Sequence, residues 1–273
     1  MKIKYLGTAA AEGIPALFCH CDVCTRSRKE GGKNIRSRSQ ALINEKLLID
    51  FPADTLSHMH ANQIDLTAIQ TLIFTHSHED HFYPNDLWYR SPPYATGVTD
   101  TLQIYGNHAV IDKCHELSTQ RSLQRKDAIH FTYVPPFIPF EREGLIITPL
   151  KANHMKDEDC YIYLIEQEGK RILYAHDTGF FPEETSEFLK NIHCDLISLD
   201  CTMGLISDGT NHLGFSDVEK VVNKLYKNKT IDTTSKIVIN HFSHNAGLMH
   251  REIEERVKEI GYIVSYDGLE III

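Results

Sequence analysis

The sequence contains no apolar run long enough to cross a bilayer, and the stretch Met1–Gly7 turns polar at once. We therefore expect no transmembrane helix, no secretory signal peptide and no membrane partner. Basic residues are also few, since 28 Lys and Arg stand against 37 Asp and Glu, for a formal net charge of −9. This balance disfavours nucleic acid as a partner, because general nucleic-acid binders usually present a basic face. The sequence shows no internal repeat, low-complexity tract or linker, so we expect a single domain over residues 1–273.

Disulfide bonds are not expected either, although the chain has seven cysteines. A chain without a signal peptide is expected in the cytoplasm, a reducing compartment where cysteines more often bind metal than pair. Cys19, Cys21 and Cys24 lie within six residues, close enough for their thiolates to bind one tetrahedral ion with a fourth ligand from elsewhere. The alternative is three reduced cysteines without a metal. The other cysteines are isolated and are expected to be ordinary core or surface residues: Cys114, Cys160, Cys194 and Cys201.

The densest polar feature is residues 75–81, which hold three histidines and an aspartate in the order His-x-His-x-Asp-His. An apolar run precedes this segment and predicts a buried strand. Residues two apart on extended backbone point the same way, so His76 and His78 can converge on one ion. Asp80 and His81 follow the turn and can face a second ion, since imidazole and carboxylate are common ligands of divalent metals. The alternative is a polar surface loop that is rich in histidine, because the chain has 16 histidines.

Three further residues of metal-ligand type occur where predicted strands end, namely His154, Asp177 and His241. The strands before them are predicted over residues 147–153, 172–176 and 236–240. Strand ends at one edge of a sheet can bring distant residues together on a rigid scaffold. Taken singly, each residue has an ordinary alternative, which is a half-buried histidine or a turn-forming aspartate.

Predicted strands outnumber predicted helices, and the helices follow groups of strands. This order predicts an α/β (α+β) fold in which two sheets pack together with helices outside. Three local predictions are specific. Residues 25–39 are expected to form an exposed basic loop, and residues 83–100 a short helix with an irregular cover. A helix is expected over residues 217–226, with Ser216 as its N-cap and Glu219 at the capping-box position.

These motifs resemble those of the metallo-β-lactamase superfamily across nearly the whole chain. The five motifs of that superfamily occur in order as Asp50, His76-Ser77-His78-Glu79-Asp80-His81, His154, Asp177 and His241. The resemblance implies a four-layer αβ/βα sandwich with two metal ions at the edge of the sheets. It implies that one ion is held by His76, His78 and His154, and the other by Asp80, His81 and His241. Asp177 would bridge the two ions, and Asp50 would orient ligands from behind, unless it is only a turn residue at a strand end.

The cysteine cluster narrows the resemblance to one branch, the cyclic phosphate phosphodiesterases of the carbon–phosphorus lyase pathway. In that branch the fourth ligand is a histidine three residues after the last catalytic histidine, which is the position of His244. The resemblance therefore implies a structural zinc on Cys19, Cys21, Cys24 and His244, with His20 or His250 as alternative fourth ligands. His212 matches the position of that branch's catalytic histidine, although a capping or surface role is the alternative. Family members often carry a second histidine shortly after it, and this chain has Phe215 nearby.

Two adjacent divalent ions, Zn or Mn by expectation, can share a hydroxide and neutralise charge on a phosphoryl oxygen. The sequence thus predicts a phosphodiesterase for a small, cyclic phosphate ester, with Asp80 and Asp177 in the metal centre and His212 assisting the leaving group. The alternatives are an RNA-processing nuclease, a thioester or lactone hydrolase and, least favoured, a non-enzymatic metal-binding protein. Residues 26–38 could lend a guanidinium to the phosphate, although a solvated basic loop is favoured. A homodimer is left open.

Overall fold

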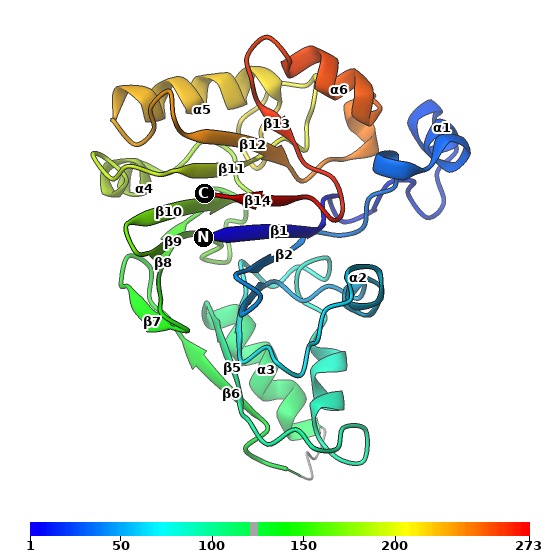
Figure 1. Ribbon diagram of the computed structural model, residues 1–273, viewed down its shortest axis with the longest axis vertical. Helices are drawn as coiled ribbons and strands as arrows, with labels where there is room; N and C mark the ends of the chain where they lie inside the picture. Colours follow the sequence, from blue (N-terminus) through cyan, green and yellow to red (C-terminus); the bar gives the residue numbers. More distant parts are fainter. Residues whose placement is uncertain (121–124) are drawn as a thin grey trace.

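The structure is a computed structural model that describes residues 1–120 and 125–273, and the chain forms two seven-stranded sheets (Figure 1). The N-terminal sheet has the strand order β14-β1-β2-β3-β4-β5-β6, and the C-terminal sheet has the order β13-β12-β11-β10-β9-β8-β7. The strands of the N-terminal sheet are β1 (Lys2–Gly7), β2 (Gln40–Ile43), β3 (Leu47–Ile49), β4 (Thr71–Ile73), β5 (Leu102–Gly106), β6 (Ile129–Tyr133) and β14 (Glu270–Ile272). Those of the C-terminal sheet are β7 (Phe140–Arg142), β8 (Leu145–Lys151), β9 (Tyr161–Gln167), β10 (Lys170–Ala175), β11 (Leu196–Asp200), β12 (Lys236–Asn240) and β13 (Ile263–Val264).

Helices cover the outer faces of both sheets (Figure 1). The α-helices are α1 (Asp22–Glu30), α2 (Thr55–Asn62), α3 (His108–Gln120), α4 (Glu183–Phe188), α5 (Phe215–Lys227) and α6 (His250–Val257). The short 3-10 helices are η1 (Gly32–Asn34), η2 (Pro84–Arg90) and η3 (His244–Ala246). Within the described residues, no helix is both long and apolar enough to span a bilayer.

Apolar side chains pack in three clusters, which separate four layers. Between the sheets, Tyr5, Tyr163 and Tyr174 are fully buried. On the outer face of the C-terminal sheet, α5 buries one stripe at helical spacing, made of Val218, Val221, Val222 and Leu225. Each of these side chains contributes roughly 1.5–3 kcal/mol by leaving water. Residues of α3 and η2 pack on the outer face of the N-terminal sheet. The layers therefore run helix, sheet, sheet, helix, which confirms the predicted four-layer sandwich.

Most strands that carry the candidate site have parallel neighbours, whereas β8, which leads to His154, pairs with antiparallel neighbours. β3, β4 and β5 pair in parallel, as do β10, β11 and β12. Parallel strands are covered on both faces, so they appear in the sequence as continuous apolar runs; every residue of β4 and of β11 is buried. Because parallel strands end at the same edge of a sheet, the segments that follow β10 and β12 share one edge of the C-terminal sheet. The segment that follows β4 of the N-terminal sheet meets them there.

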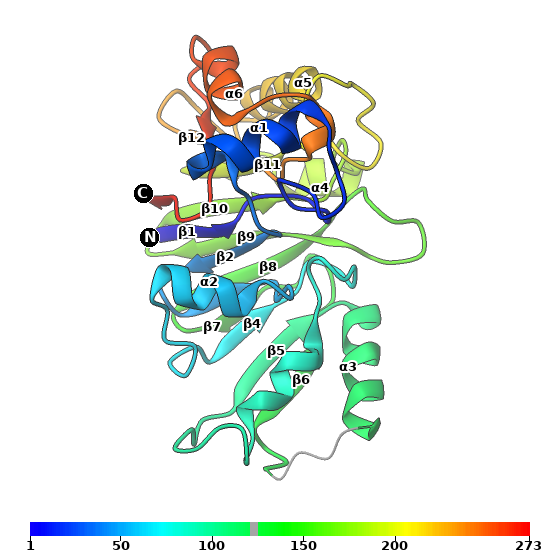
Figure 2. The ribbon, with the colours of Figure 1, turned by 90° about the vertical axis from the view of Figure 1, so that its right-hand side faces the viewer.

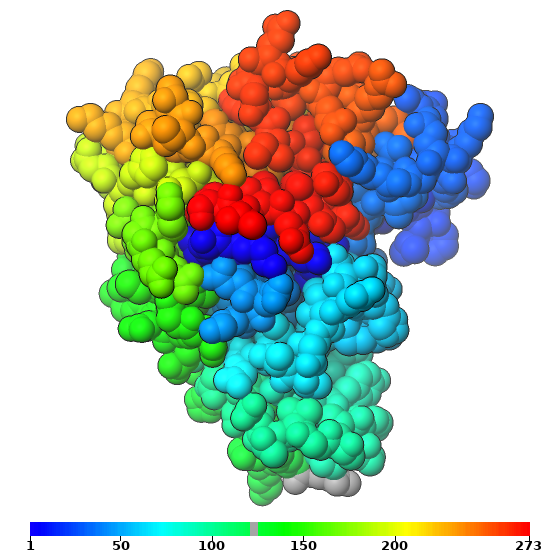
Figure 3. Space-filling model, in the orientation of Figure 1, coloured from blue at the N-terminus to red at the C-terminus, as the bar shows by residue number. Residues whose placement is uncertain are grey.

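The two chain ends also meet. Lys2 pairs with Ile272 in the β1–β14 ladder, and the amino group of Met1 donates to the carbonyl of Ile273 at 3.0 Å. Figure 3 shows the N-terminal strand in blue beside the C-terminal strand in red. The last strand thus closes the edge of the sheet that contains the first.

The structure corrects the prediction of an exposed loop over residues 25–39. Helix α1 begins at Asp22, and the Sγ atom of Cys21 accepts a hydrogen bond from the amide of Cys24 at 3.4 Å at its start. The helix is polar, so its sequence lacks a clear apolar stripe, and it lies beside α6 (Figure 2). Arg26 of α1 donates to Glu252 of α6 at 2.7 Å. Contacts that are distant in sequence therefore hold a helix that local composition does not predict.

The predicted start of the helix after Ser216 is also wrong. Helix α5 begins at Phe215 with Gly214 as its N-cap, and Asp217 takes the capping-box position expected for Glu219. The amide of Phe215 donates to the carbonyl of Gly204 at 2.8 Å, and this tertiary contact fixes the earlier start. Helix α2 and strand β7 were not among the predicted elements. The expected short helix after residue 83 is present as η2.

Candidate metal centre

The motif at residues 75–81 leaves β4 and turns back on itself at the sheet edge. The carbonyl of His78 accepts from the amides of His81 at 3.0 Å and Phe82 at 2.7 Å, which closes a tight turn. On the other side, the amide of Phe51, which follows β3, donates to the carbonyl of His81 at 2.8 Å. The turn is thus fixed by backbone hydrogen bonds, and its side chains are directed at the segments that follow β8, β10 and β12.

Three imidazoles form a first cluster, made of His76, His78 and His154. The Nδ1 atom of His78 lies 2.9 Å from Nε2 of His76 and 3.1 Å from Nε2 of His154. Burial lowers the pKa of His76 well below its usual range, so this ring is neutral and can offer a lone pair. Neutral imidazole nitrogens that converge on one point are the donor set that Zn²⁺ and similar ions prefer.

A second cluster lies beside the first and consists of Asp80, His81, Asp177 and His241. The Oδ2 atom of Asp177 is buried and has no hydrogen-bond partner within the described part of the chain. It lies 2.5 Å from Nε2 of His81 and 3.0 Å from Nε2 of His241. The other oxygen of Asp177, Oδ1, lies 3.8 Å from Nε2 of His154 in the first cluster. Asp177 therefore stands between the clusters with one oxygen toward each.

Groups behind the clusters determine which imidazole nitrogen carries the proton. His81 places Nδ1 at 2.7 Å from Asp50 Oδ2, and His241 places Nδ1 at 2.8 Å from the hydroxyl of Thr202. His154 places Nδ1 at 3.3 Å from the carbonyl of Asn211. If each Nδ1–H donates to its oxygen partner, each Nε2 is left as a lone pair directed inward. This arrangement of outer partners is typical of metal-binding histidines.

The closely packed carboxylates of the second cluster favour a bound cation. Burial alone would lower the pKa of His81, but the carboxylates of Asp177, Asp80 and Asp50 raise it well above its usual range. Burial would likewise raise the pKa of Asp177, but the facing imidazoles of His241 and His81 hold it well below its usual range. Packed charges of this kind are costly unless a positive charge sits among them. The second cluster therefore fits one divalent ion, and the three imidazoles of the first cluster fit another.

Three residues at or behind the two clusters have strained backbone conformations. Asp50, Asp177 and His241 have φ values of 64°, 49° and 62°, in the left-handed region that non-glycine residues rarely occupy. Each follows the end of a buried strand at the sheet edge. Such conformations cost on the order of 1–3 kcal/mol each and cluster at functional sites. The strain turns these side chains toward one point instead of along the sheet.

A cavity of about 710 Å³ opens above the clusters and is lined by His78, Asp80, His154, Asp177, His212 and His241. His212 is half-buried at its wall, where Nδ1 lies 2.9 Å from Asp200 Oδ2 and the ring stacks on His241 with centroids 5.9 Å apart. Burial would lower the pKa of His212, but the carboxylates of Asp200 and Asp177 raise it to about 9. Phe215 is buried at the start of α5 and packs in the core beneath.

Two site residues were missed by sequence reasoning, Asp200 and Glu158. Asp200 is fully buried and accepts hydrogen bonds from His212 and from the amides of Asp177 and Leu213, at 2.9, 3.1 and 2.9 Å. Asp200 is the last residue of β11, and the other site residues likewise end or follow their strands. Its position at a strand end was the one feature of the sequence that could have identified it. Glu158 has no such signal, because it lies in the loop before β9.

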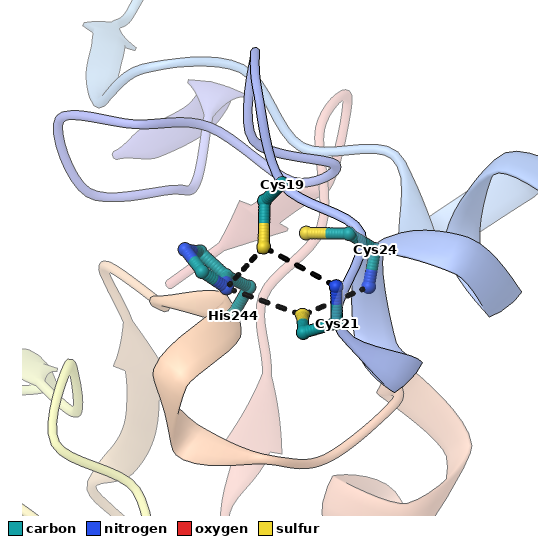
Figure 4. A group of neighbouring side chains, drawn as sticks. All are labelled: Cys19, Cys21, Cys24 and His244. Atoms are coloured by element: carbon teal, nitrogen blue, oxygen red, sulfur yellow. Dashed lines mark hydrogen bonds between the residues drawn. The ribbon is translucent and has the colours of Figure 1, made fainter.

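A separate group joins Cys19, Cys21, Cys24 and His244 (Figure 4). The thiols come from the N-terminal loop and the start of α1, and the imidazole comes from η3. The Nδ1 atom of His244 lies 3.7 Å from Sγ of Cys19 and 3.4 Å from Sγ of Cys21. A tetrahedral zinc with ordinary bond lengths separates sulfur and nitrogen ligands by about 3.5 Å. This donor set therefore fits one zinc ion.

The alternative fourth ligands lie elsewhere. His250 is engaged by Arg36 at 2.8 Å and by Glu254 at 2.9 Å, and His20 is exposed outside the group. No arginine of the basic stretch is among the described residues that line the cavity of about 710 Å³. Arg36 is buried against Ser265 at 2.7 Å, and Arg38 lies beside Asp54 at 3.2 Å. The isolated cysteines Cys114, Cys160, Cys194 and Cys201 are all buried.

Comparison with known proteins shows which family the chain belongs to. A family model described as Anti-Pycsar protein Apyc1 matches residues 39–250. The chain belongs to this family. The matched region of this Apyc1 family member contains every residue of the two clusters and His212, whereas Cys19, Cys21 and Cys24 precede it.

Two curated proteins resemble this Apyc1 family member over most of its length. An octanoyltransferase from Porphyromonas gingivalis is 24% identical over 286 residues, which cover 100% of this chain and 52% of that protein. The chain thus spans about half the length of that relative. A ribonuclease Z from Listeria monocytogenes is 23% identical over 246 residues, which cover 88% of this chain and 73% of that protein.

Solved structures share the fold. A diphosphatase described as a member of the PhnP family has a TM-score of 0.78 and 21% identity, covering 100% of this chain and 97% of that one. Zinc-bound PqqB from Methylobacterium extorquens has a TM-score of 0.78 and 16% identity, covering 100% of both chains. The short form of human tRNase Z has a TM-score of 0.65 and 15% identity, covering 100% and 99%. These likenesses confirm the predicted metallo-β-lactamase fold, which a Bacillus subtilis protein described by that fold also shares, with a TM-score of 0.70 and 18% identity, covering 99% of this chain and 98% of that one.

Proposed function

We propose that this protein is a metal-dependent phosphodiesterase that hydrolyses a small, cyclic phosphodiester. The observation that carries the proposal is the position of Asp177, whose two oxygens face two adjacent clusters of ligand-type side chains. Two divalent ions bound there would activate water as a nucleophile and neutralise charge on the phosphoryl oxygens. In this proposal His76, His78 and His154 hold one ion, and Asp80, His81 and His241 hold the other. Zn and Mn both suit these ligands.

In this proposal, other residues of the chain orient the metal ligands, and His212 supplies a proton to the leaving group. Asp50, Thr202 and Asn211 hold the rings of His81, His241 and His154, so that ligand atoms are oriented before substrate arrives. Asp200 holds Nδ1 of His212 at 2.9 Å, which leaves Nε2 as the nitrogen that can meet a substrate. From there His212 would donate a proton to the oxygen of the departing alcohol.

The cavity supports a small substrate. Its volume of about 710 Å³ falls in the range of small-molecule sites and is too limited to enclose a folded polymer. Hydrogen-bonding side chains also line it, including Glu12, Ser243 and Asn245. These groups suit the hydroxyls of a sugar, so a cyclic sugar phosphate is the substrate class that we favour.

RNA processing is the second candidate, because the chain is related to a ribonuclease Z from Listeria monocytogenes at 23% identity. One panel separates the candidates. The chelated protein is reloaded with Mn²⁺ or Zn²⁺ and assayed on bis(p-nitrophenyl) phosphate, a 2′,3′-cyclic ribose phosphate, a short RNA and an acyl thioester. Preference for the cyclic phosphate supports the proposal. Strong thioester turnover without phosphodiester turnover, or turnover of RNA alone, would overturn it.

The role of His212 has its own test. His212→Ala should lower kcat by roughly 10²–10⁴-fold, the usual contribution of a general acid, while the metal content is unchanged. Metal content is measured by elemental analysis of the same preparation. Loss of metal from His212→Ala, or an unchanged kcat, would show that the residue has a different role.

A further inference from the structure

A second cavity, of about 210 Å³, lies on the outer face of the N-terminal sheet. Among the residues that the structure describes, it shares no lining residue with the candidate active site. Its floor comes from β3, β4 and β5, through Leu48, Leu72 and Leu102. Its cover comes from η2 and the segment after it, with Leu87 and Arg90 among the lining residues. The irregular cover expected from the sequence therefore encloses a pocket of its own.

The cavity is lined mainly by apolar side chains, and Arg90 is unusual among its polar residues because it has buried donors without a partner. The Nε and Nη2 atoms of Arg90 are buried, and neither has a hydrogen-bond partner within residues 1–120 and 125–273. A buried donor without an acceptor costs about 1–3 kcal/mol, and more when the group is charged. Asp86 also lines the cavity, but within the described residues it accepts no hydrogen bond from Nε or Nη2 of Arg90.

The surroundings of Arg90 disfavour its charged form on balance. Burial and the nearby charge of Arg125 lower the pKa of the Arg90 guanidinium, and the Asp100 carboxylate offsets them only in part. Arg125 is itself engaged by the carbonyls of Val98 and Asp100 at 2.6 and 2.8 Å and by the Asp127 carboxylate at 3.0 Å. Two donor atoms of Arg90 thus lie without partners beside the aliphatic walls of the cavity.

We propose that this cavity binds a small aliphatic monocarboxylate. A carboxylate can accept two parallel hydrogen bonds from the planar guanidinium of Arg90, which a neutral or cationic head group cannot do. The leucines of the floor would contact the tail. A cavity of about 210 Å³ is larger than an engineered apolar cavity of about 150 Å³ that takes benzene, so a chain of about six carbons fits.

The chain offers a direct reporter of binding. Trp88 is the single tryptophan of the sequence and lies between Leu87 and Tyr89, both of which line the cavity. Its fluorescence can be followed during titration with hexanoate, 1-hexanol and hexylamine, which share a tail and differ in the head group. Hexanoate should bind at least tenfold more tightly than 1-hexanol, and hexylamine should not bind.

Arg90→Met should lower the affinity for hexanoate at least tenfold and leave the affinity for 1-hexanol unchanged. The control Arg251→Met, at an exposed position, should change neither affinity. Circular dichroism checks that each variant is folded. If Arg90→Met does not fold, Arg90→Lys takes its place, with an intermediate loss because the charge remains and the paired donors do not. Equal affinity for hexanoate and 1-hexanol, or hexanoate affinity that is unchanged by substitution of Arg90, overturns the proposal. Neither outcome depends on metal loading or hydrolysis.

Discussion

Ser77 stands between two proposed ligands, His76 and His78, and is held by a carboxylate from another loop. Glu158 accepts from the amide of Ser77 at 2.8 Å and from its hydroxyl at 2.6 Å. Lys113 donates to the same hydroxyl at 2.9 Å. Because Glu158 lies on the loop that also carries His154, this contact joins the two loops that form the first cluster. Glu158 is therefore a positioning residue for that cluster.

Glu158→Gln should weaken metal binding at the first cluster about tenfold, since residues that support ligands typically contribute 10- to 100-fold in affinity. The amide keeps the shape of the side chain but removes the charge that strengthens its hydrogen bonds. Competition with a chromophoric chelator measures the affinity without any assay of turnover. Asp159→Asn, at the next position and exposed, is the matched control. Equal affinities in wild type and Glu158→Gln would refute this role.

His58 gives a prediction about acid stability that is independent of the metal centre. It is buried between the hydroxyl of Ser37 at 2.6 Å and Oε1 of Gln40 at 2.7 Å. Burial lowers the pKa of His58 from 6.5 to about 4. The unfolded chain then takes up a proton before the folded chain does. The stability that His58 contributes is therefore complete above pH 6.5 and is lost as the pH falls toward 4, by roughly 3 kcal/mol.

His58→Gln should flatten the decline in the free energy of unfolding between pH 6.5 and 4.5. Urea denaturation of chelated samples measures it, so that loss of metal in acid does not contribute. His60→Gln, two residues away and exposed, should leave the decline unchanged. An identical pH dependence in His58→Gln and wild type would contradict the assignment.

At the scale of elements, helix α1 depends on the cysteine group at its start. Its N-cap is Cys21, a proposed zinc ligand, and Cys24 lies in its first turn. Sγ of Cys24 also accepts from the amide of Ala16 at 3.3 Å, so the same group holds the preceding loop. Because η3 supplies His244 and the neighbouring Ser243 lines the active-site cavity, the group links α1 to the rim of the site.

His244→Ala should remove one equivalent of zinc and increase hydrogen exchange over residues 16–30, while the strands keep their protection. Mass spectrometry of exchange and elemental analysis measure the two effects. His20→Ala removes a neighbouring exposed histidine and should leave both unchanged. If His20→Ala loses the zinc and His244→Ala keeps it, the fourth ligand is misassigned.

Strands and ligand positions could be predicted from the sequence because each depends on local pattern. A buried strand that ends in a polar residue is visible in the sequence, as at Asn240–His241. The helix α1 and the roles of Asp200 and Glu158 could not be predicted, because they rest on partners far away in sequence. The resemblance implied His244 as the fourth ligand, and the structure brings it to the three cysteines, whereas His250 is engaged by Arg36.

At the scale of the molecule, two sheets carry ligands from both halves of the chain to one edge. The N-terminal sheet supplies residues 76–81, and the segments after strands of the C-terminal sheet supply His154, Asp177 and His241. The proposed two-ion centre can form only when both halves pack, which couples metal binding to folding. A single domain, a homodimer and the cytoplasmic location stay predictions.

The measurement that tests the central claim most directly is turnover of bis(p-nitrophenyl) phosphate while Zn²⁺ or Mn²⁺ is added back to the chelated protein. We predict no turnover without ions, a rise that saturates when the two-ion centre is filled, and no recovery in Asp177→Ala, which should still hold zinc at its cysteines. Turnover that persists after chelation, or that is equal in wild type and Asp177→Ala, would contradict a two-ion hydrolase.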